Sequence, residues 1–297
     1  MRAARASPIA CSRCRSRPSR RSPIRTISAS TARRPGPIRV PAVEPYLVIV
    51  LGGAALAGFV QGLSGFAFAL VSLSVWAWAV SPELAAPMAV FGSLVGQLVT
   101  IPVVGANFRL KGLAPFIVGG VLGVPMGIFL LSLLDPTGFK LALGLFLLAY
   151  SPAMLFVSPS FRVTFGGNWA NGAVGWLGGV FGGMGGLAGA IPTLWCTLTG
   201  MNKESQRGIM QGFNITMHVT TLIGYFLAGT ISSPLVWQHF GLVAAALVAP
   251  ALLGGYFFNR LDTRAFRRLV LLLLFVSGLV LTSATLPQVL AASALPN

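Results

Sequence analysis

The sequence predicts an all-α polytopic membrane protein. Of its 297 residues, 55% are hydrophobic and only 9% are charged, and its mean hydropathy is +0.81. A chain with this composition cannot cover a water-soluble surface with polar groups. From residue 46 onward, apolar blocks long enough to cross about 30 Å of hydrocarbon as helices are separated by short polar loops. The alternation that a membrane β-barrel requires is not visible. We therefore expect about eight to ten membrane helices.

Residues 1–45 differ in composition from the rest of the chain. The formal net charge is +16, but eleven of the 21 Lys and Arg residues lie within the first 39 positions. This Arg-, Ser- and Pro-rich stretch contains no apolar run, so we expect a disordered tail. Its composition fits an organelle transit peptide or an upstream-extended start, and we favour the extended start. The positive charge therefore does not indicate a nucleic-acid partner.

Two stretches of the body are similar to later stretches of the same chain. The segment "GFVQGLSGFA" from Gly58 aligns with "GVFGGMGGLA" from Gly179 at an offset of 121 residues. A second segment, "GIFLLSLLDPTGFKLALGLFLL" from Gly127, aligns with "GYFFNRLDTRAFRRLVLLLLF" from Gly254 at an offset of 127. Self-similarity at a nearly fixed offset indicates a duplicated unit.

The duplication predicts two membrane repeats, at 46–166 and 167–297. Each repeat is expected to contain a broken pair of short helices followed by three longer helices. The predicted broken pairs are 46–62 with 65–80, and 168–183 with 187–200. The predicted longer helices are 84–106, 113–133 and 138–157 in the first repeat, and 208–230, 239–258 and 265–285 in the second.

The charges of the loops favour an inverted second repeat. If each broken pair returns to its starting side, each repeat crosses the membrane an odd number of times. In that arrangement only Lys140 lies on one side, and the other side carries Arg109, Lys111, Arg162, Lys203, Arg207, Arg260, Arg264, Arg267 and Arg268. Cytoplasmic loops carry an excess of Lys and Arg, which places these basic loops in the cytoplasm. The Arg-rich tail then lies outside, in conflict with the same rule.

The two helix breaks are the predicted binding site. Half-helices that meet inside a membrane can point the positive ends of their dipoles at an anion. Ser64 is expected to cap the second half-helix, and Gly65 to let a ligand approach the backbone. The candidate binding residues are Gln61, Gly62, Ser64, Gly65, Phe66, Gly183, Met184, Gly185, Gly186, Thr193, Thr197 and Asn214. The alternative is that these glycines only allow close helix packing.

Few polar residues lie within the apolar blocks, and each has two interpretations. Gln61 either donates to an anion or forms a hydrogen bond between helices. Asn214 and His218, four residues apart, share one helical face. His218 is our candidate for proton coupling, while an interior hydrogen-bonded histidine is the favoured alternative. Lys203 and Arg207 are candidate vestibule residues, although the preference for basic cytoplasmic loops also explains them.

Nothing in the sequence indicates an enzyme, a cofactor or a metal site. The body has two histidines, and none of its four acidic residues lies within an apolar block. It therefore lacks the nucleophile–base pair or ligand cluster that catalysis requires. The C-x-x-C of Cys11 and Cys14 has no second ligand pair, and Cys196 is expected to be a packed hydrophobe.

Several of these segments resemble the sulfite exporter (TauE/SafE) family, also called the toluenesulfonate uptake permease family. The resemblance rests on "GFVQGLSGFAFALV", "SPELAAPMAV" and "GGVFGGMGGLAGAIPTLWCTLTGMNKESQRGIMQGFN", and it extends over nearly all of 46–285. It implies a permease for small sulfur-containing or carboxylate anions such as sulfite, sulfoacetate or other organosulfonates. The second break commonly approaches Gly-Ile-Gly-Gly-Pro-Pro in that family, and this sequence departs from that pattern.

The expected function is secondary transport by alternating access around the two breaks. The expected location is the cell inner (plasma) membrane, with multiple crossings. The expected partners are a small anion and the lipid bilayer, with protons as the candidate coupling ion. The alternatives are an anion channel and, less favoured, a non-transporting accessory subunit.

Overall fold

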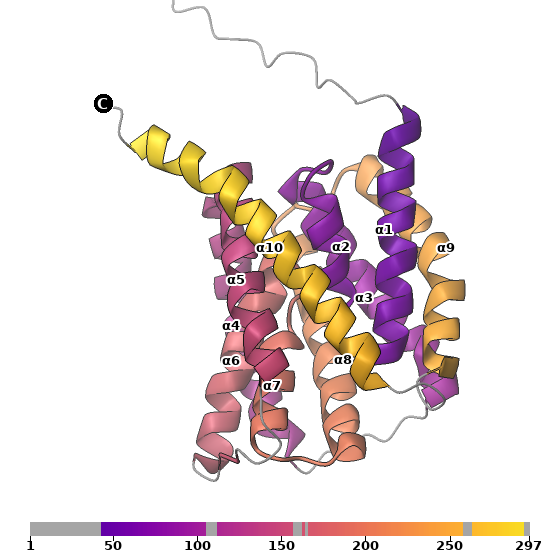
Figure 1. Cartoon of the computed structure of the whole chain (residues 1–297), viewed down its shortest axis with the longest axis vertical. Coiled ribbons are helices and arrows are strands. Elements are labelled where there is room, and N and C mark those ends of the chain that lie inside the picture. The colour runs from indigo at the N-terminus through magenta and orange to yellow at the C-terminus, as the bar shows by residue number, and fades with distance from the viewer. Residues whose placement is uncertain (1–42, 105–111, 157–161, 164–165, 258–262, 294–297) are drawn as a thin grey trace, which may run out of the picture. The chain divides into compact units, whose positions relative to one another are not determined.

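The computed structural model describes residues 43–104, 112–156, 162–163, 166–257 and 263–293. The predicted tail lies almost entirely outside these ranges, as do Arg109, Lys111 and Arg260. All regular secondary structure of the described residues is helical, and it forms ten helices, α1 to α10 (Figure 1). The predicted all-α class is confirmed.

Each predicted helix has a counterpart in the structure. The first five are α1 (Val43–Ser64), α2 (Phe68–Trp76), α3 (Pro82–Val104), α4 (Leu113–Leu133) and α5 (Pro136–Phe156). The second five are α6 (Gly167–Gly185), α7 (Ala190–Leu198), α8 (Lys203–Leu227), α9 (Pro234–Phe257) and α10 (Thr263–Ser293). The largest shift is at the end of α10, which was predicted to stop at residue 285.

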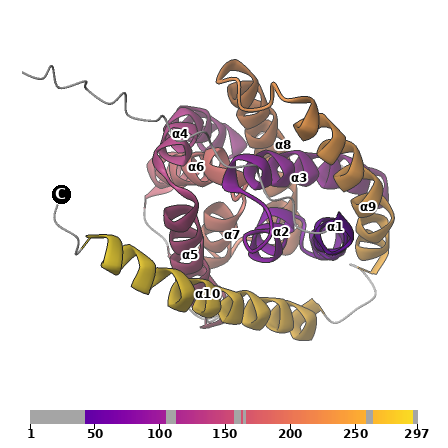
Figure 2. The ribbon, with the colours of Figure 1, turned by 90° about the horizontal axis from the view of Figure 1, so that it is seen from above.

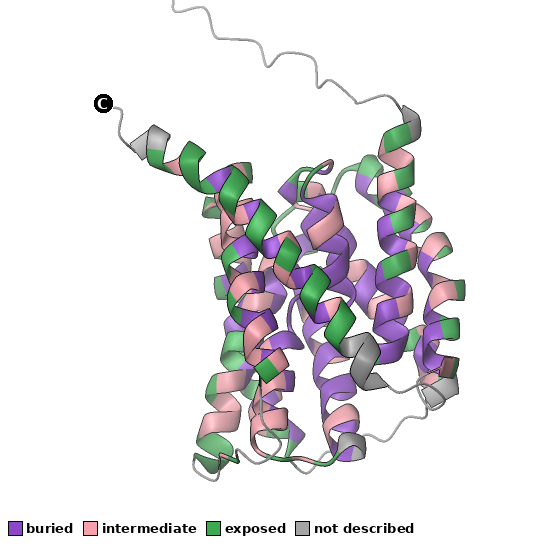
Figure 3. Cartoon of the chain, in the orientation of Figure 1, coloured by how far each residue is buried: buried purple, intermediate pink, exposed green. Residues whose placement is uncertain are grey.

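Six of the described helices are long and apolar enough to cross a membrane: α1, α3, α4, α5, α9 and α10. Helix α8 carries several polar side chains, and α2 and α7 have nine residues each. Large apolar residues such as Leu272, Leu273 and Val276 are exposed along α10 (Figure 3). Such a surface suits lipid rather than water. The chain is therefore a multi-pass membrane protein.

The first helix of each half packs against the fourth helix of the other half. Helix α1 packs along α9, helix α6 packs along α4, and α5 packs against α10 (Figure 2). A Cβ on Gly62 would lie 2.9 Å from the carbonyl carbon of Gly254, and a Cβ on Gly183 would lie 3.0 Å from Cα of Gly127. In the sequence alignment Gly62 corresponds to Gly183, and Gly127 to Gly254. The two crossings are therefore equivalent, and both depend on glycine for close approach.

The directions of α1 and α6 agree with an inverted second half. Figure 1 shows α1 starting at one end of the helical body and α6 starting at the opposite end. Residues 41–297 group into one compact unit, with no division at residue 166. The inverted duplication stays a prediction that these contacts support, and its two halves interleave instead of forming separate lobes.

Candidate functional site

The first helix break lies between α1 and α2. Helix α1 ends at Ser64, and Gly65 follows with a φ of 84°. This left-handed conformation strongly favours glycine, and it commonly ends a helix. The Gly65 amide donates to the Gln61 carbonyl oxygen over 2.6 Å, which completes the last turn.

The second break, between α6 and α7, repeats this backbone geometry. Gly186 has a φ of 80°, and its amide donates to the Gly182 carbonyl oxygen over 2.7 Å. Gly65 and Gly186 are equivalent in the alignment at offset 121. The two interruptions therefore end their helices in the same way.

Gln61 ties the first break together. Its Oε1 accepts from the amide of Phe68, the first residue of α2, over 2.9 Å. Its Nε2 donates to the carbonyl oxygen of Ser93 on α3 over 2.8 Å. The side chain is 1% exposed. Of its two interpretations, the structure therefore shows the hydrogen bond between helices.

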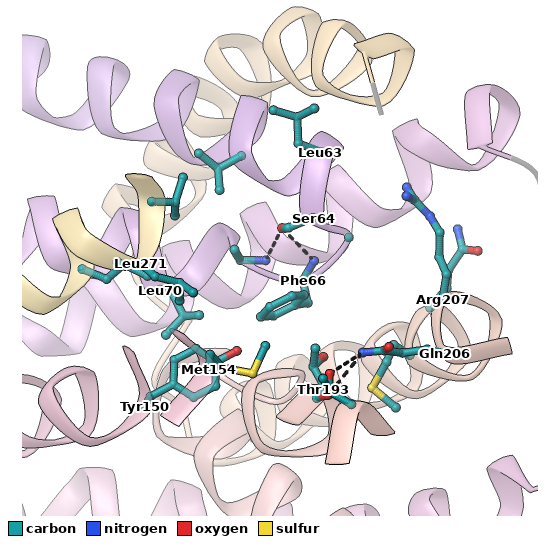
Figure 4. A pocket seen from close by; sticks show the side chains of 18 of the residues that line it. Leu63, Ser64, Phe66, Leu70, Tyr150, Met154, Thr193, Gln206, Arg207 and Leu271 are labelled. Atoms are coloured by element: carbon teal, nitrogen blue, oxygen red, sulfur yellow. Dashed lines mark hydrogen bonds between the residues drawn. The ribbon is translucent and has the colours of Figure 1, made fainter. Parts of the chain in front are cut away.

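Ser64 and Gln97 satisfy other backbone groups that this break leaves without helical partners. The Phe66 and Ala67 amides donate to the Ser64 hydroxyl oxygen over 3.4 Å and 3.2 Å (Figure 4). The side-chain amide of Gln97 donates to the Gly65 carbonyl oxygen. Ser64 therefore bonds the two amides just before α2 through two long hydrogen bonds that are weaker than average. The amide of Phe68, the first residue of α2, bonds Gln61 instead, so the capping role expected of Ser64 stays a prediction.

A cavity of about 200 Å³ lies beside the first break (Figure 4). One part of its wall is apolar, and the other carries hydroxyl, amide and guanidinium groups. The residues that line it are Val60, Leu63, Ser64, Gly65, Phe66, Ala67, Leu70, Gln97, Thr100, Tyr150, Met154, Thr193, Thr197, Gln206, Arg207, Met210, Gln211, Val270, Leu271 and Leu274. The wall thus combines the first break with α3, α5, α7, α8 and α10.

On α7, beside the start of α8, the Thr193 hydroxyl has no hydrogen-bond partner in the described part of the chain. The Thr197 hydroxyl donates to the Thr193 carbonyl oxygen over 2.8 Å and accepts from Gln206 Nε2 over 3.2 Å. The Thr193 hydroxyl oxygen is buried and has no hydrogen-bond partner among the described residues. A buried polar group of this kind costs stability unless a ligand or water satisfies it.

Arg207 is the only cationic residue among those that line the cavity, and no acidic residue lines it. Its side chain is partly buried, near the start of α8 (Figure 4). The side chain of Lys203, the other predicted vestibule residue, lies outside the described residues. Among the described residues of the cavity wall, the only formally charged side chain is therefore a cation.

The glycines of the second break do not line this cavity. A Cβ on Gly186 would lie 3.2 Å from Cα of Val90 on α3, and one on Gly185 would lie 3.2 Å from a methyl group of Leu73 on α2. Gly183 packs against α4, and Met184 is partly buried. In this structure the second break is a packed contact and not an open surface.

Asn214 and His218 also lie outside the cavity wall, with exposed fractions of only 1% and 2%. Both side-chain amide atoms of Asn214 and Nδ1 of His218 have no hydrogen-bond partner among the described residues. A Cβ on Gly189, in the second break, would lie 2.7 Å from Oδ1 of Asn214 and 2.9 Å from Cβ of Phe66, in the first. The two breaks therefore meet beside Asn214.

Most residues of the cavity wall were not predicted as site residues, and three of them show why. Gln206 adjoins Arg207 on α8, so its position was within reach of the helical pattern. Tyr150 and Met154 come from α5, an apolar helix whose place beside the cavity no local pattern indicates.

Metal ligands do not gather within the described part of the chain. No group of three or more His, Cys, Asp or Glu residues there is placed to hold an ion. Cys196 is a buried free cysteine within a hydrophobic cluster. Cys11 and Cys14 lie outside the described residues.

Comparison with known proteins identifies the family. The model described as "Sulfite exporter TauE/SafE" matches residues 50–281, most of the chain. No curated protein and no solved structure matches. The chain therefore belongs to the sulfite exporter TauE/SafE family, a family of membrane transporters for anions.

Proposed function

We propose that this TauE/SafE family member is a secondary transporter of a small organic anion in the cell inner (plasma) membrane, and that the cavity at the first break holds the anion. The observation that carries the proposal is the composition of the described cavity wall, which includes the cationic Arg207 and no acidic residue. A charge in a poorly hydrated cavity interacts with an ion more strongly than it would in water. Such a wall favours anions over cations.

Hydrogen-bond donors near Arg207 complete the anion site. The Thr193 hydroxyl is buried without a partner among the described residues and would bond an anionic oxygen once it turns into the cavity. The start of α2 presents the positive end of a helix dipole. Ser64, Gly65, Phe66 and Thr197 remain in the proposed site because they line the same cavity. Gln61 and Gly62 support its geometry from behind, while Gly183, Met184, Gly185 and Gly186 belong to the opposite, closed break.

The apolar part of the wall favours an organic anion. Leu70, Met154 and Leu271 face the cavity (Figure 4). An apolar cavity of about 150 Å³ holds a benzene molecule in another protein. A space of about 200 Å³ therefore accommodates a charged group together with a small apolar body. We propose an organosulfonate or a carboxylate such as sulfoacetate as the substrate, in preference to sulfite.

The difference between the two breaks supports alternating access. The cavity is lined by the early turns of α8 and α10, whose first residues include several Lys and Arg. It therefore lies near the predicted cytoplasmic side, and we propose that it opens there, while the second break is packed. A change in which the first break closes and the second opens would carry the anion across the membrane. An open channel would instead need a continuous pore.

His218 is the proposed proton-coupling residue. It is a buried imidazole within the membrane body, on the same helical face as Asn214. Replacing His218 with Gln should abolish the acceleration of transport by a pH gradient while leaving anion exchange intact. Unchanged dependence on the gradient would reject this role.

Reconstitution into liposomes tests the function. Flux of sulfite, sulfoacetate and acetate should be measured under imposed pH gradients, for the natural chain and for Arg207→Gln and Arg268→Gln. Loss of the cavity charge should lower kcat/KM at least about tenfold, a change of about 1.4 kcal/mol in transition-state stabilisation. The exposed Arg268 provides a control of equal charge change. Absence of flux for every anion would refute the transporter and favour an accessory subunit.

A further inference from the structure

The polar face of α8 continues beyond the cavity. Arg207 and Gln211 lie on this face and line the cavity, but Asn214, the next polar residue along it, does not. Residues three and four positions apart are neighbours on a helix surface. The cavity therefore ends between Gln211 and Asn214.

Phe66 lies at this boundary. It lines the cavity, and Figure 4 shows its ring between Ser64 and Thr193 in that view. Its Cβ is 2.9 Å from the position of a Cβ on Gly189, which in turn is 2.7 Å and 2.8 Å from the amide atoms of Asn214. Phe66 thus lies between the end of the cavity and the buried side-chain amide of Asn214.

The Phe66 side chain has more room to move than that of Asn214. The backbone of residues 65–67 is held by hydrogen bonds of Gly65 and Ala67, but the Phe66 ring is only partly buried beside the cavity. Asn214, by contrast, sits on a long helix and is 1% exposed. The Phe66 ring can therefore change position at a smaller cost than Asn214.

We propose that Asn214 forms an inner polar subsite, closed off from the cavity by Phe66, and that the charged group of the anion reaches Asn214 when Phe66 moves. The proposal rests on the proposed function. The two amide atoms of Asn214, which have no hydrogen-bond partner among the described residues, are its independent support, because leaving a buried amide unpaired is costly unless a ligand binds it. The amide nitrogen donates to an anionic oxygen in the occupied state.

Cysteine labelling tests the barrier without requiring transport. In a full-length chain with Cys11, Cys14 and Cys196 changed to Ser, Asn214→Cys is treated with the anionic reagent 2-sulfonatoethyl methanethiosulfonate. Adding Phe66→Ala should raise the labelling rate at least about tenfold, because a closed site is reached only through a minor open population. Equal rates with and without Phe66→Ala would overturn the proposal.

Two other positions control for loosening of the structure. Gln211→Cys lies on the cavity side and should react with Phe66 present or replaced. Met217→Cys, fully buried against α4, should stay unreactive in both backgrounds. Reaction of Met217→Cys in the Phe66→Ala chain would show general loosening and overturn the barrier role.

Protection by sulfoacetate separates the subsite from the function. With Phe66 present, sulfoacetate should slow labelling at Gln211→Cys. In the Phe66→Ala chain it should slow labelling at Asn214→Cys as well, and protection there at Gln211→Cys alone would reject the inner subsite. Absence of protection at Gln211→Cys with Phe66 present would count against the proposed anion site itself.

Discussion

The two helix breaks have the same backbone but different surroundings. Gly65 and Gly186 share a left-handed conformation and an equivalent hydrogen bond. A Cβ on Gly65 would meet no atom within 4 Å, whereas one on Gly186 would lie 3.2 Å from Val90. A duplicated backbone can therefore form an open wall in one half and a packed contact in the other.

The residue types at the two breaks agree with this difference in surroundings. The first break has Gln61 and Ser64 where the second has Gly182 and Gly185, at the same offset of 121 residues. In the first break these polar side chains bond the backbone that the interruption frees. In the second, backbone carbonyl oxygens accept instead: the Leu187 amide donates to the Phe181 carbonyl oxygen and the Ala190 amide to that of Leu187, each over 3.2 Å.

Removing Gln61 should have the largest effect on this comparison. Gln61→Leu leaves the buried Phe68 amide without its partner, at about 1–3 kcal/mol, and also removes the bond to the Ser93 carbonyl oxygen, which keeps its place within helix α3. The variant should therefore unfold at a clearly lower temperature in detergent, as monitored by intrinsic fluorescence. Gln288→Leu, at an exposed position of α10, is the matched control and should change little. Equal shifts for both variants would show that Gln61 does not hold the first break.

Alanine at the two left-handed glycines should show an intermediate effect. Gly65→Ala incurs only the conformational cost, about 1–2 kcal/mol. Gly186→Ala adds overpacking against Val90, about 1–3 kcal/mol more. Thermal unfolding of the two variants side by side measures the difference. If Gly65→Ala were the less stable of the two, the contrast between an open and a packed break would be wrong.

Substitution of Thr193 should affect stability least. Its hydroxyl has no partner in the described structure, so Thr193→Val should leave the unfolding temperature unchanged or raise it slightly. The same variant should weaken sulfoacetate binding, measured by titration calorimetry. Thr220→Val is the control and should leave binding unchanged, since Thr220 lies outside the cavity wall and its hydroxyl already bonds the Thr216 carbonyl oxygen. A destabilised Thr193→Val with unchanged binding would assign this hydroxyl to folding.

The fold was more predictable than the site. Helix lengths follow from the bilayer thickness, and the breaks follow from glycines that recur at a fixed offset. The same repeat led us to expect both breaks in one binding site, because sequence similarity shows equivalent backbones but not what packs against them. Val90 against Gly186 and Tyr150 beside the cavity are contacts between distant segments, which no local pattern contains.

Labelling of Ser64→Cys from each side of the membrane tests the central claim most directly. The chain would lack its other cysteines, and a membrane-impermeant thiol reagent would be applied to right-side-out and inside-out vesicles, with and without sulfoacetate. We predict reaction from the side of the basic loops, slowed by sulfoacetate, because Ser64 is exposed in the cavity at the first break. Reaction only from the opposite side, or a rate that sulfoacetate does not change, would contradict an anion site there.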